Sequence, residues 1–336
     1  MTAKFLALAA ALTLASGTFG LAQDARTLTD DLDYPWDIEV HDGSVYITEK
    51  KGNLVILRDG ALQRIAVETS APTLDDRGGG LLGMALSPDF ATSGRVVLYQ
   101  HTGTSDARSN RVIEAVLQDG ALRETRVLLD AIPGHPLYNG GRVAFGPDGM
   151  LYVTTGWTEN PALPQDLGSL AGKILRLTPD GAVPADNPFD GSPVWSLGHR
   201  NPQGLAWDDA GTLFAAEHGQ SGHDEVNRIE RGGNYGWPLV HGTETGDGLI
   251  PPLSQSGGTT WAPSGLAWDG AGLLVAGLRS QGILRVATDG TTALAHDVDE
   301  RTRDIAVTPE GIYAITTARS PRRDGPSGDR LVLIPR

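Results

Sequence analysis

The block from Gly198 to Pro238 concentrates the side chains best suited to bind a ligand or to do chemistry. It reads G-H-R-N-P-Q-G-L-A-W at its start, E-H-G-Q-S-G-H-D-E-V-N in its middle and G-G-N-Y-G-W-P at its end. A core strand would alternate apolar and polar residues, and this block does not. It places hydrogen-bond donors and acceptors on short glycine-rich turns, which is how a rigid scaffold presents a site. We therefore expect its loops to line the functional site.

A group of arginine and amide side chains predicts a donor-rich, cationic wall. Its members are Arg200, Asn201, Gln203, Arg279, Arg301 and Arg303. The guanidinium group donates in a fixed planar fork that suits carboxylates. Since the chain has a formal net charge of −14, such a concentration of arginine favours a polyanionic ligand. The alternative is ordinary ion pairing, for example between Arg303 and Asp304.

The run from Glu217 to Glu225 has the composition of a site for a hard cation. Carboxylates and free loop carbonyls are the ligands that Ca²⁺ prefers. His218 and His223 would suit zinc, but no matching three-ligand spacing accompanies them. Each of these histidines has the alternative role of a satisfied loop residue. The chain has no cysteine, which excludes thiolate-bound metals, thiol nucleophiles and disulfides.

A repeated strand–turn–strand pattern predicts the scaffold that positions these loops. Its six copies start at Trp36, Gly83, Gly141, Gly204, Gly265 and Arg303, with spacings of 47, 58, 63, 61 and 38 residues. Pro-Asp-Gly and Asp-Gly at the turns tolerate positive φ and suit tight hairpins. One β-rich unit per 40 to 60 residues is typical of propeller blades. We predict an all-β, six-bladed β-propeller that forms a single domain over residues 23–336; a sandwich with chance repeats is the alternative.

The propeller topology predicts which polar clusters meet. The first strand of each blade lines the central channel, so the loops that lead into these strands converge at one mouth. Four polar clusters directly precede such strands: Asp75–Gly80, His135–Arg142, His199–Gln203 and Arg301–Arg303. We expect them to lie together although they are far apart in the sequence.

Residues 1–22 have the pattern of a secretory signal peptide. Lys4 supplies the positive charge, Phe5 to Leu14 the apolar run, and Gly20-Leu21-Ala22 a small-residue cleavage site near Ala22. The run is too short to span a bilayer, and a buried N-terminal helix is the alternative. The sequence thus predicts a periplasmic or secreted protein without a membrane span. The charge of −14 argues against nucleic acid and anionic membranes as partners.

From about Tyr34 to the C-terminus the chain resembles the soluble pyrroloquinoline-quinone-dependent glucose/sorbosone dehydrogenases, also called aldose sugar dehydrogenases. The shared motifs are Gly79-Gly80-Leu81-Leu82-Gly83, Gly140-Gly141-Arg142 with Phe145-Gly146-Pro147-Asp148-Gly149, Gly172-Lys173-Ile174-Leu175-Arg176, Asp186-Asn187-Pro188-Phe189 and the Gly198–Pro238 block. None of these motifs is specific alone, and together they are.

The resemblance implies a six-bladed propeller that binds pyrroloquinoline quinone (PQQ) and Ca²⁺. The family oxidises a sugar hydroxyl at the anomeric carbon to a lactone: a histidine takes the hydroxyl proton, and hydride passes to the quinone. An external acceptor then removes the electrons. By resemblance the cofactor contacts are Arg200, Asn201, Gln203, Arg279 (where many relatives have lysine), Arg301 and Arg303. The Ca²⁺ ligands are the carbonyls of Gly219 and Gln220, the latter usually proline.

Three positions depart from the family pattern. The catalytic histidine is replaced by Tyr138, the carboxylate that orients it by Trp157, and a cofactor-contacting Glu or Gln by Gly78. An unperturbed phenol has a pKa near 10 and is a weak base at neutral pH. His135, three residues upstream of Tyr138, is a second candidate for the base.

These observations favour an exported quinoprotein sugar dehydrogenase with an altered proton acceptor. A quinone- or sugar-binding propeller without turnover, and a Ca²⁺-dependent sugar lactonase, remain as alternatives, because fold alone does not fix chemistry. Trp157 and Trp261 could stack on a sugar ring or serve only packing. The sequence leaves the identity of the sugar open.

Overall fold

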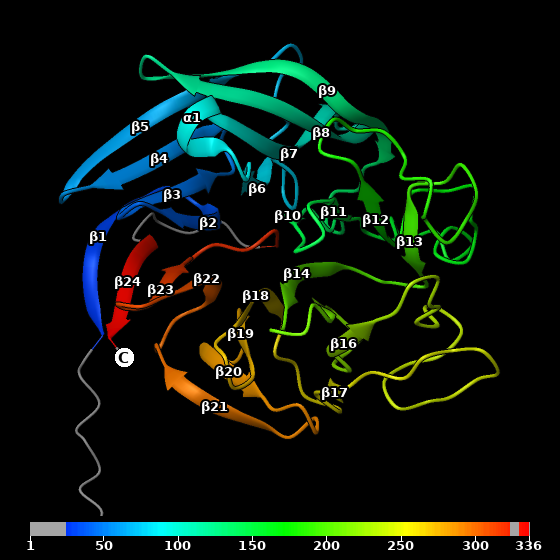
Figure 1. The fold of residues 1–336 in the computed structure, drawn as a ribbon. Coiled ribbons are helices and arrows are strands. Elements are labelled where there is room, and N and C mark those ends of the chain that lie inside the picture. Colours follow the sequence, from blue (N-terminus) through cyan, green and yellow to red (C-terminus); the bar gives the residue numbers. More distant parts are fainter. Residues whose placement is uncertain (1–24, 323–328, 336) are drawn as a thin grey trace, which may run out of the picture.

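The computed structural model describes residues 25–322 and 329–335, and their regular secondary structure is almost entirely β-strand. Within them the single α-helix is the short α1 (Phe90–Ser93). The sheets are arranged in a ring around a common centre (Figure 1). The predicted all-β class is confirmed. The proposed signal peptide, residues 1–22, lies outside the described residues.

Four of the sheets have four strands and one has eight. The eight-stranded sheet contains β2 (Pro35–His41), β3 (Ser44–Glu49), β4 (Asn53–Arg58), β5 (Ala61–Glu68), β9 (Ala121–Pro133), β8 (Ala107–Gln118), β7 (Arg95–Thr104) and β6 (Leu81–Leu86). The next sheet contains β10 (Val143–Phe145), β11 (Leu151–Thr154), β12 (Lys173–Leu177) and β13 (Val194–Leu197). It is followed by a sheet of β14 (Pro202–Trp207), β15 (Leu213–Glu217), β16 (Glu225–Ile229) and β17 (Ser254–Gln255). A further sheet contains β18 (Pro263–Trp268), β19 (Leu273–Gly277), β20 (Gly282–Val286) and β21 (Thr292–Asp297). The last sheet contains β22 (Thr302–Thr308), β23 (Gly311–Thr316), β24 (Asp329–Pro335) and β1 (Arg26–Leu32).

The eight-stranded sheet is continuous only because β5 and β9 pair. That pairing is parallel and short, with Val67 opposite Leu122 and Glu68 opposite Arg123. All other neighbouring strands in this sheet run antiparallel. Two repeats therefore share one hydrogen-bonded sheet, and the count of six blades stays a prediction.

The ring is closed by the two ends of the chain. The N-terminal strand β1 pairs antiparallel with β24, from Arg26 opposite Leu333 to Leu32 opposite Asp329. The sheet that begins with β22 is thus completed by a strand from the opposite end of the sequence. Backbone hydrogen bonds, which cooperate along the ladder, hold the ends together without any disulfide.

Every predicted repeat start falls in or just before the first strand of a four-stranded unit. These strands are β2, β6, β10, β14, β18 and β22. Contacts join β2 to β6 and β22, β6 to β10, and β18 to β14 and β22. At Gly83 the inner strands approach so closely that an added Cβ would lie 2.2 Å from the carbonyl oxygen of Gly141. The predicted ring of inner strands is confirmed.

Alternation along the strands divides the core between neighbouring sheets. In β19, Leu273 and Val275 pack into one hydrophobic cluster while Leu274 and Ala276 pack into the next. Successive side chains point to opposite faces of a strand, and both faces are covered here. This explains why the middle strands read as continuous apolar runs rather than alternating ones.

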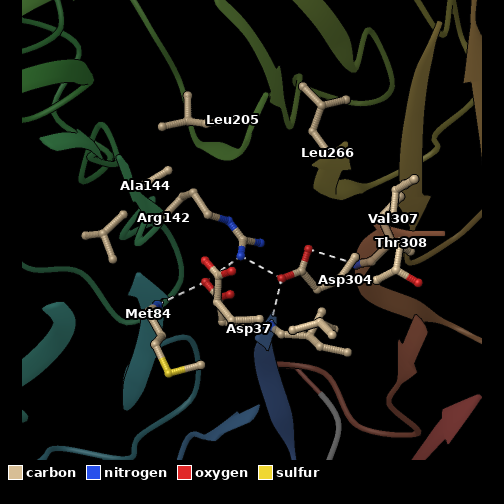
Figure 2. Close-up of a pocket in the computed structure, with 15 residues that line it drawn as sticks. Asp37, Met84, Arg142, Ala144, Leu205, Leu266, Asp304, Val307 and Thr308 are labelled. Atoms are coloured by element: carbon tan, nitrogen blue, oxygen red, sulfur yellow. Dashed lines mark hydrogen bonds and ion pairs between the residues drawn. The ribbon is translucent and has the colours of Figure 1, made fainter. Parts of the chain in front are cut away.

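The channel at the centre is blocked by one buried guanidinium group. Arg142, just before β10, donates from Nη1 to Asp37 (2.5 Å) and to Asp304 (2.6 Å) and from Nε to the carbonyl of Gln203 (2.8 Å). Its guanidinium also lies over the ring of Trp36, 4.7 Å from the ring centre. Figure 2 shows Arg142 between the two carboxylates. A side chain before one inner strand therefore ties together three others.

Below this arginine lies a cavity of about 260 Å³ that all six inner strands line. A third acid, Glu39, lines the cavity, and its carboxylate forms no hydrogen bond or ion pair within the described residues. Burial in the channel raises the pKa of Glu39 to about 7, and the charge of Asp304 adds to the rise. Burial also raises the pKa of Asp37 well above its usual range. Three carboxyl groups thus share one guanidinium, and burial favours the protonated form of two of them.

We expect Glu39 to make stability depend on pH. Its pKa is raised above the ordinary 4.5, so the folded state binds this proton more tightly than the unfolded chain does. The free energy of unfolding should therefore fall as pH rises through about 7. Glu39→Gln should reduce the fall between pH 5 and pH 8, measured by urea unfolding, by about 2 kcal/mol.

Glu68→Gln is the matched control, because Glu68 pairs with Arg123 where both side chains are 58% exposed. It should change the pH dependence by no more than a few tenths of a kcal/mol. An unaltered pH dependence in Glu39→Gln would contradict the assignment.

Candidate functional site

The four predicted polar clusters meet at one end of the channel, which we call the loop mouth. The amide of Gly78 donates to the carbonyl of Pro136 (2.7 Å), and that of Gly140 donates to Oδ1 of Asn201 (3.0 Å). Arg303 donates from Nη1 to Oε1 of Gln203 (3.1 Å). Each bond joins two clusters that are remote in sequence, so their predicted convergence is confirmed.

Strand β15 and its neighbours position Arg200. The backbone amide of Arg200 donates to Oε2 of Glu217 (2.7 Å), whose Oε1 is 2.8 Å from Nδ1 of His199. The side chain of Arg200 donates from Nη1 to the carbonyl of His218 (3.1 Å), and its Nε has no partner in the described chain. The carboxylate of Glu217 thus fixes the backbone of Arg200 and leaves its charge unpaired.

Three aromatic rings surround the guanidinium group of Arg200. Its carbon lies 4.6 Å from the ring centre of Tyr138, 5.3 Å from that of Trp237 and 5.7 Å from that of Trp157. Cation–π attraction of this kind holds a guanidinium without neutralising it. Trp157, which we expected to stand at the position of a family carboxylate, is therefore part of an aromatic cage around Arg200.

Arg303 and Arg301 are also without a carboxylate partner among the described residues. Arg303 is 3% exposed and bonds only neutral groups, Gln203 and the hydroxyl of Ser264 (3.2 Å). Arg301 donates from Nη1 to the carbonyl of Leu278 (3.0 Å). The Nε atom of each is buried and unpaired. The ion pair considered between Arg303 and Asp304 is not formed, because Asp304 pairs with Arg142 instead.

Burial of these unpaired cations changes how tightly they hold their protons. Burial lowers the pKa of Arg303 to about 10. Burial also lowers the pKa of Arg301, and the nearby positive charge of Arg279 lowers it further. The side chain of Arg279 is exposed. A pKa near 10 still leaves Arg303 charged at neutral pH. The loop mouth is therefore a concentrated positive region in an acidic protein.

Tyr138 and His135 form one stacked pair. Their ring centres are 5.3 Å apart and the ring planes differ by 8°. Nδ1 of His135 accepts from the backbone amides of Leu137 (3.1 Å) and Tyr138 (3.3 Å), while its Nε2 is 3.5 Å from Glu159. Burial lowers the pKa of His135. Its accepting nitrogen is thus already engaged within its own loop.

The hydroxyl of Tyr138 has one partner in the described chain. Nη2 of Arg322 donates to it at 3.1 Å. The ring is 8% exposed and has His135 stacked on it and Arg200 close to it. The phenol oxygen thus has one guanidinium donor, Arg322, and a second guanidinium, that of Arg200, lies over the face of the ring.

The loop at Gly219 is shaped by Asp224, whose carboxylate is saturated by protein donors. Asp224 accepts from the amide of Gly219 (2.9 Å) through Oδ1, and from Thr260 and the amides of Trp261 and Ala262 (2.7 to 2.8 Å) through Oδ2. Trp261 is thus fixed through its backbone. The described residues contain no group of three or more His, Asp and Glu side chains arranged to hold a metal.

The carbonyl oxygens of Gly219 and Gln220 accept no hydrogen bond from any described residue. They are thus available as hard ligands, as the sequence suggested. The neighbouring His218 is neutral at physiological pH, because burial lowers its pKa to about 4. Nε2 of His218 has no partner within the described chain, and neither has Nδ1 of His223. The carbonyls of Gly219 and Gln220 thus belong to a pocket that Glu217 and Glu225 also line.

Gly78 leaves no room for a side chain. A Cβ added to it would lie 2.8 Å from the carbonyl oxygen of Leu137 and 2.9 Å from that of Pro136. The loop that carries Tyr138 has thus taken up this space. Gly78 therefore packs directly against the loop that carries Tyr138.

Two residues of the loop mouth were not identified from the sequence. Tyr34 and Lys50 are both buried beside the arginines. Lys50 donates from Nζ to the carbonyl of Arg77 (2.6 Å) and lies 4.1 Å above the ring of Tyr34. No sequence signal marked Tyr34. A residue before proline normally adopts an extended conformation, whereas Tyr34 has a φ of 57°.

The sequence of this chain matches a known protein family. The sequence profile described as "Glucose / Sorbosone dehydrogenase" matches residues 32–323. The chain belongs to the glucose/sorbosone dehydrogenase family. The family resemblance noted in its motifs is thereby confirmed.

Similar proteins agree with this assignment. The aldose sugar dehydrogenase YliI of Escherichia coli is 30% identical, over 93% of this chain and 93% of its own. The PQQ-bound aldose sugar dehydrogenase of Streptomyces coelicolor has a TM-score of 0.84 at 34% identity and covers 91% of this chain and 95% of its own. The apo-form of the E. coli aldose sugar dehydrogenase has a TM-score of 0.81 at 29% identity, covering 93% and 99%. This member of the glucose/sorbosone dehydrogenase family thus shares nearly the whole fold with them.

The unpaired arginines of this glucose/sorbosone dehydrogenase family member predict a specific pattern of stability. Arg303→Met removes a buried charge that no carboxylate balances, so the free energy of unfolding should stay unchanged or rise by about 1 kcal/mol. Arg142→Met is the control: it strips two buried carboxylates of their partner and should lower the free energy of unfolding by about 3 to 5 kcal/mol. Urea unfolding of the two variants makes the comparison. Equal losses in both would mean that Arg303 is paired in a way the structure does not contain.

Proposed function

We propose that this protein is an exported, PQQ-dependent aldose dehydrogenase in which Tyr138 takes the role of proton acceptor. The observation that carries the proposal is the set of buried arginines, Arg200, Arg301 and Arg303, which have unpaired Nε atoms and no carboxylate partner among the described residues. Membership of the family and the names of its similar members agree with this.

The residues present fit an acidic quinone. Unpaired buried cations are costly unless a counter-charge arrives, and a carboxylate-bearing quinone supplies one. Arg200, Arg301 and Arg303 would hold its carboxylates, with Asn201 and Gln203 as neutral partners. Arg279, which is exposed at the rim, would add attraction at longer range. The donor set is therefore suited to a planar polyanion.

The loop at Gly219 fits a hard cation held in part by the bound ligand. Two free carbonyls, from Gly219 and Gln220, are too few to hold Ca²⁺, which takes six to eight oxygen ligands. The remaining ligands would come from the quinone and from water. This arrangement predicts that Ca²⁺ and PQQ bind together, and that neither binds tightly alone.

When bound, the quinone supplies a two-electron hydride acceptor and Ca²⁺ polarises it as a Lewis acid. The chain must supply the rest. The hydroxyl proton at the anomeric carbon has to leave as the C–H bond transfers its electron pair, so that the ring carbon becomes a lactone carbonyl. The external electron acceptor, which then reoxidises the cofactor, is a separate partner.

Tyr138 is the group best placed to accept the proton. Arg322 donates a hydrogen bond to its oxygen at 3.1 Å, and the guanidinium of Arg200 lies over its ring. A donor that is already in place needs no reorganisation when charge develops on that oxygen during the reaction. His135, whose Nδ1 accepts two backbone hydrogen bonds, would act as a positioning residue that stacks on Tyr138.

The two alternatives lead to different requirements. A Ca²⁺-dependent lactonase needs a cation centre that activates water without a quinone, and the described residues offer no cluster of acidic and histidine side chains for it. A non-catalytic quinone or sugar binder needs only the arginines and the aromatic cage. Substitution of the family histidine by Tyr138 is the observation that favours the second alternative.

The broader architecture completes the proposal. We infer six blades, because each half of the eight-stranded sheet repeats the four-stranded pattern of the others and the halves meet only through two residue pairs. We infer export from the signal-peptide pattern of residues 1–22. In residues 25–322 and 329–335, no helix is long and apolar enough to cross a membrane.

The first prediction is that the protein binds PQQ in the presence of Ca²⁺ and oxidises aldoses. The Ca²⁺-loaded protein is titrated with PQQ by calorimetry, and an aldose panel is then added with an electron-accepting dye. Binding with sugar-dependent dye reduction is the expected result. Binding without reduction would support the non-catalytic alternative, and hydrolysis of a sugar lactone without PQQ would support the lactonase.

The second prediction concerns the proton acceptor. Tyr138→Phe should lower turnover by about 10²-fold or more, a typical contribution of a general base, while the affinity for PQQ changes little. Tyr138→His should retain activity and move the rising limb of the pH–rate profile to lower pH, because an imidazole has a lower ordinary pKa than a phenol. Full activity of Tyr138→Phe would contradict this role and direct attention to His135→Gln.

A further inference from the structure

The hydroxyl of Tyr34 is a buried polar group without a partner among the described residues. The residue is 6% exposed, and its oxygen is inaccessible to solvent and forms no hydrogen bond. A buried hydroxyl left unpaired is destabilising, because it has lost its hydrogen bonds to water. Since a phenylalanine would avoid this cost, the hydroxyl needs an explanation.

The ring of Tyr34 is held firmly in one place. Nζ of Lys50 lies 4.1 Å from the ring centre and the guanidinium carbon of Arg319 lies 4.8 Å from it. The amide of Tyr34 donates to Asp329 (2.7 Å), and its carbonyl accepts from the amide of Lys50 (3.1 Å). Its φ of 57° is unusual for a bulky residue. The surrounding structure therefore fixes a strained residue, which is typical of functional positions.

The hydroxyl belongs to the cationic part of the loop mouth. The charges that act on it most strongly are those of Arg303 and Arg301, followed by Asp75 and Arg319. Burial raises the pKa of Tyr34 despite these arginines, so the hydroxyl stays protonated and is a hydrogen-bond donor at neutral pH. An acceptor with negative charge is the partner that this position lacks.

Tyr34 also lies near Gly78, the position at which the family's cofactor contact is missing. The family's cofactor contact there is absent, and the carbonyls of Leu137 and Pro136 occupy the space that its side chain would need. Lys50, which packs on the ring of Tyr34, donates to the carbonyl of Arg77, the residue next to Gly78. Tyr34 is thus a neighbour of the lost contact.

We propose that Tyr34 is a further cofactor-binding residue, whose hydroxyl donates a hydrogen bond to an anionic oxygen of the bound acidic quinone. The inference rests on the proposed function. It assigns to Tyr34 the contact that Gly78 cannot make and explains an unpaired hydroxyl held in a strained backbone. Arg301 and Arg303 bind the same ligand by charge, and Tyr34 fixes its orientation.

Tyr34→Phe tests the proposal, because it removes the oxygen and keeps the ring between Lys50 and Arg319. The dissociation constant for PQQ, measured by calorimetry with saturating Ca²⁺, should rise about tenfold or more, as expected for a lost hydrogen bond to a charged group. The absorption spectrum of bound PQQ should also shift. The free energy of unfolding of the cofactor-free protein should not fall, because no protein partner is lost.

Tyr313→Phe is the matched control: the hydroxyl of Tyr313 donates to Glu310 (2.8 Å), far from the loop mouth. It should leave the affinity for PQQ and the spectrum unchanged. If wild type binds PQQ and Tyr34→Phe binds it equally well with an unaltered spectrum, the inference is overturned and the proposed function stands. If wild type does not bind PQQ, the proposed function falls and the inference with it.

Discussion

The pairing of Arg142 with Asp37 and Asp304 is the interaction on which the rest of the structure depends. It joins the inner strands β2 and β22 through their carboxylates and β14 through the carbonyl of Gln203. Three of the four polar clusters of the mouth, His135–Arg142, His199–Gln203 and Arg301–Arg303, end at or next to these same groups. Any shift at the centre would therefore displace Arg303 and Gln203 together. The geometry of the site is set by a buried ion pair and not by the loops alone.

Charge is distributed unequally along the channel. Acids exceed the one guanidinium at the centre, where Asp37, Glu39 and Asp304 meet Arg142, and arginines are left without carboxylates at the loop mouth. Folding alone would favour the pairing of these two sets, since isolated buried charges are costly. Their separation has a simple explanation if a negatively charged ligand completes the loop mouth. Stability is thus sacrificed where binding requires it, as is common at functional sites.

The sequence predicted most of the scaffold and only the outline of the site. Turn motifs and strand patterns are local, so the repeat starts and the inner strands were predictable, and convergence of the leading loops followed from topology. The union of β5 with β9 was not predictable, because it depends on two residue pairs between separate hairpins. Likewise, only the folded structure reveals that Nδ1 of His135 is engaged and that Tyr34 has an unpaired hydroxyl.

Tyr138 and Trp157 are linked by their shared neighbour, Arg200. A carboxylate at position 157 would lie beside this guanidinium and neutralise it, whereas Trp157 contacts it through a ring and leaves its charge free. That charge then acts on the phenol of Tyr138, 4.6 Å away. Under the proposed function, Tyr138 and Trp157 would therefore act as one unit with Arg200, in place of the histidine and carboxylate that the family resemblance implies.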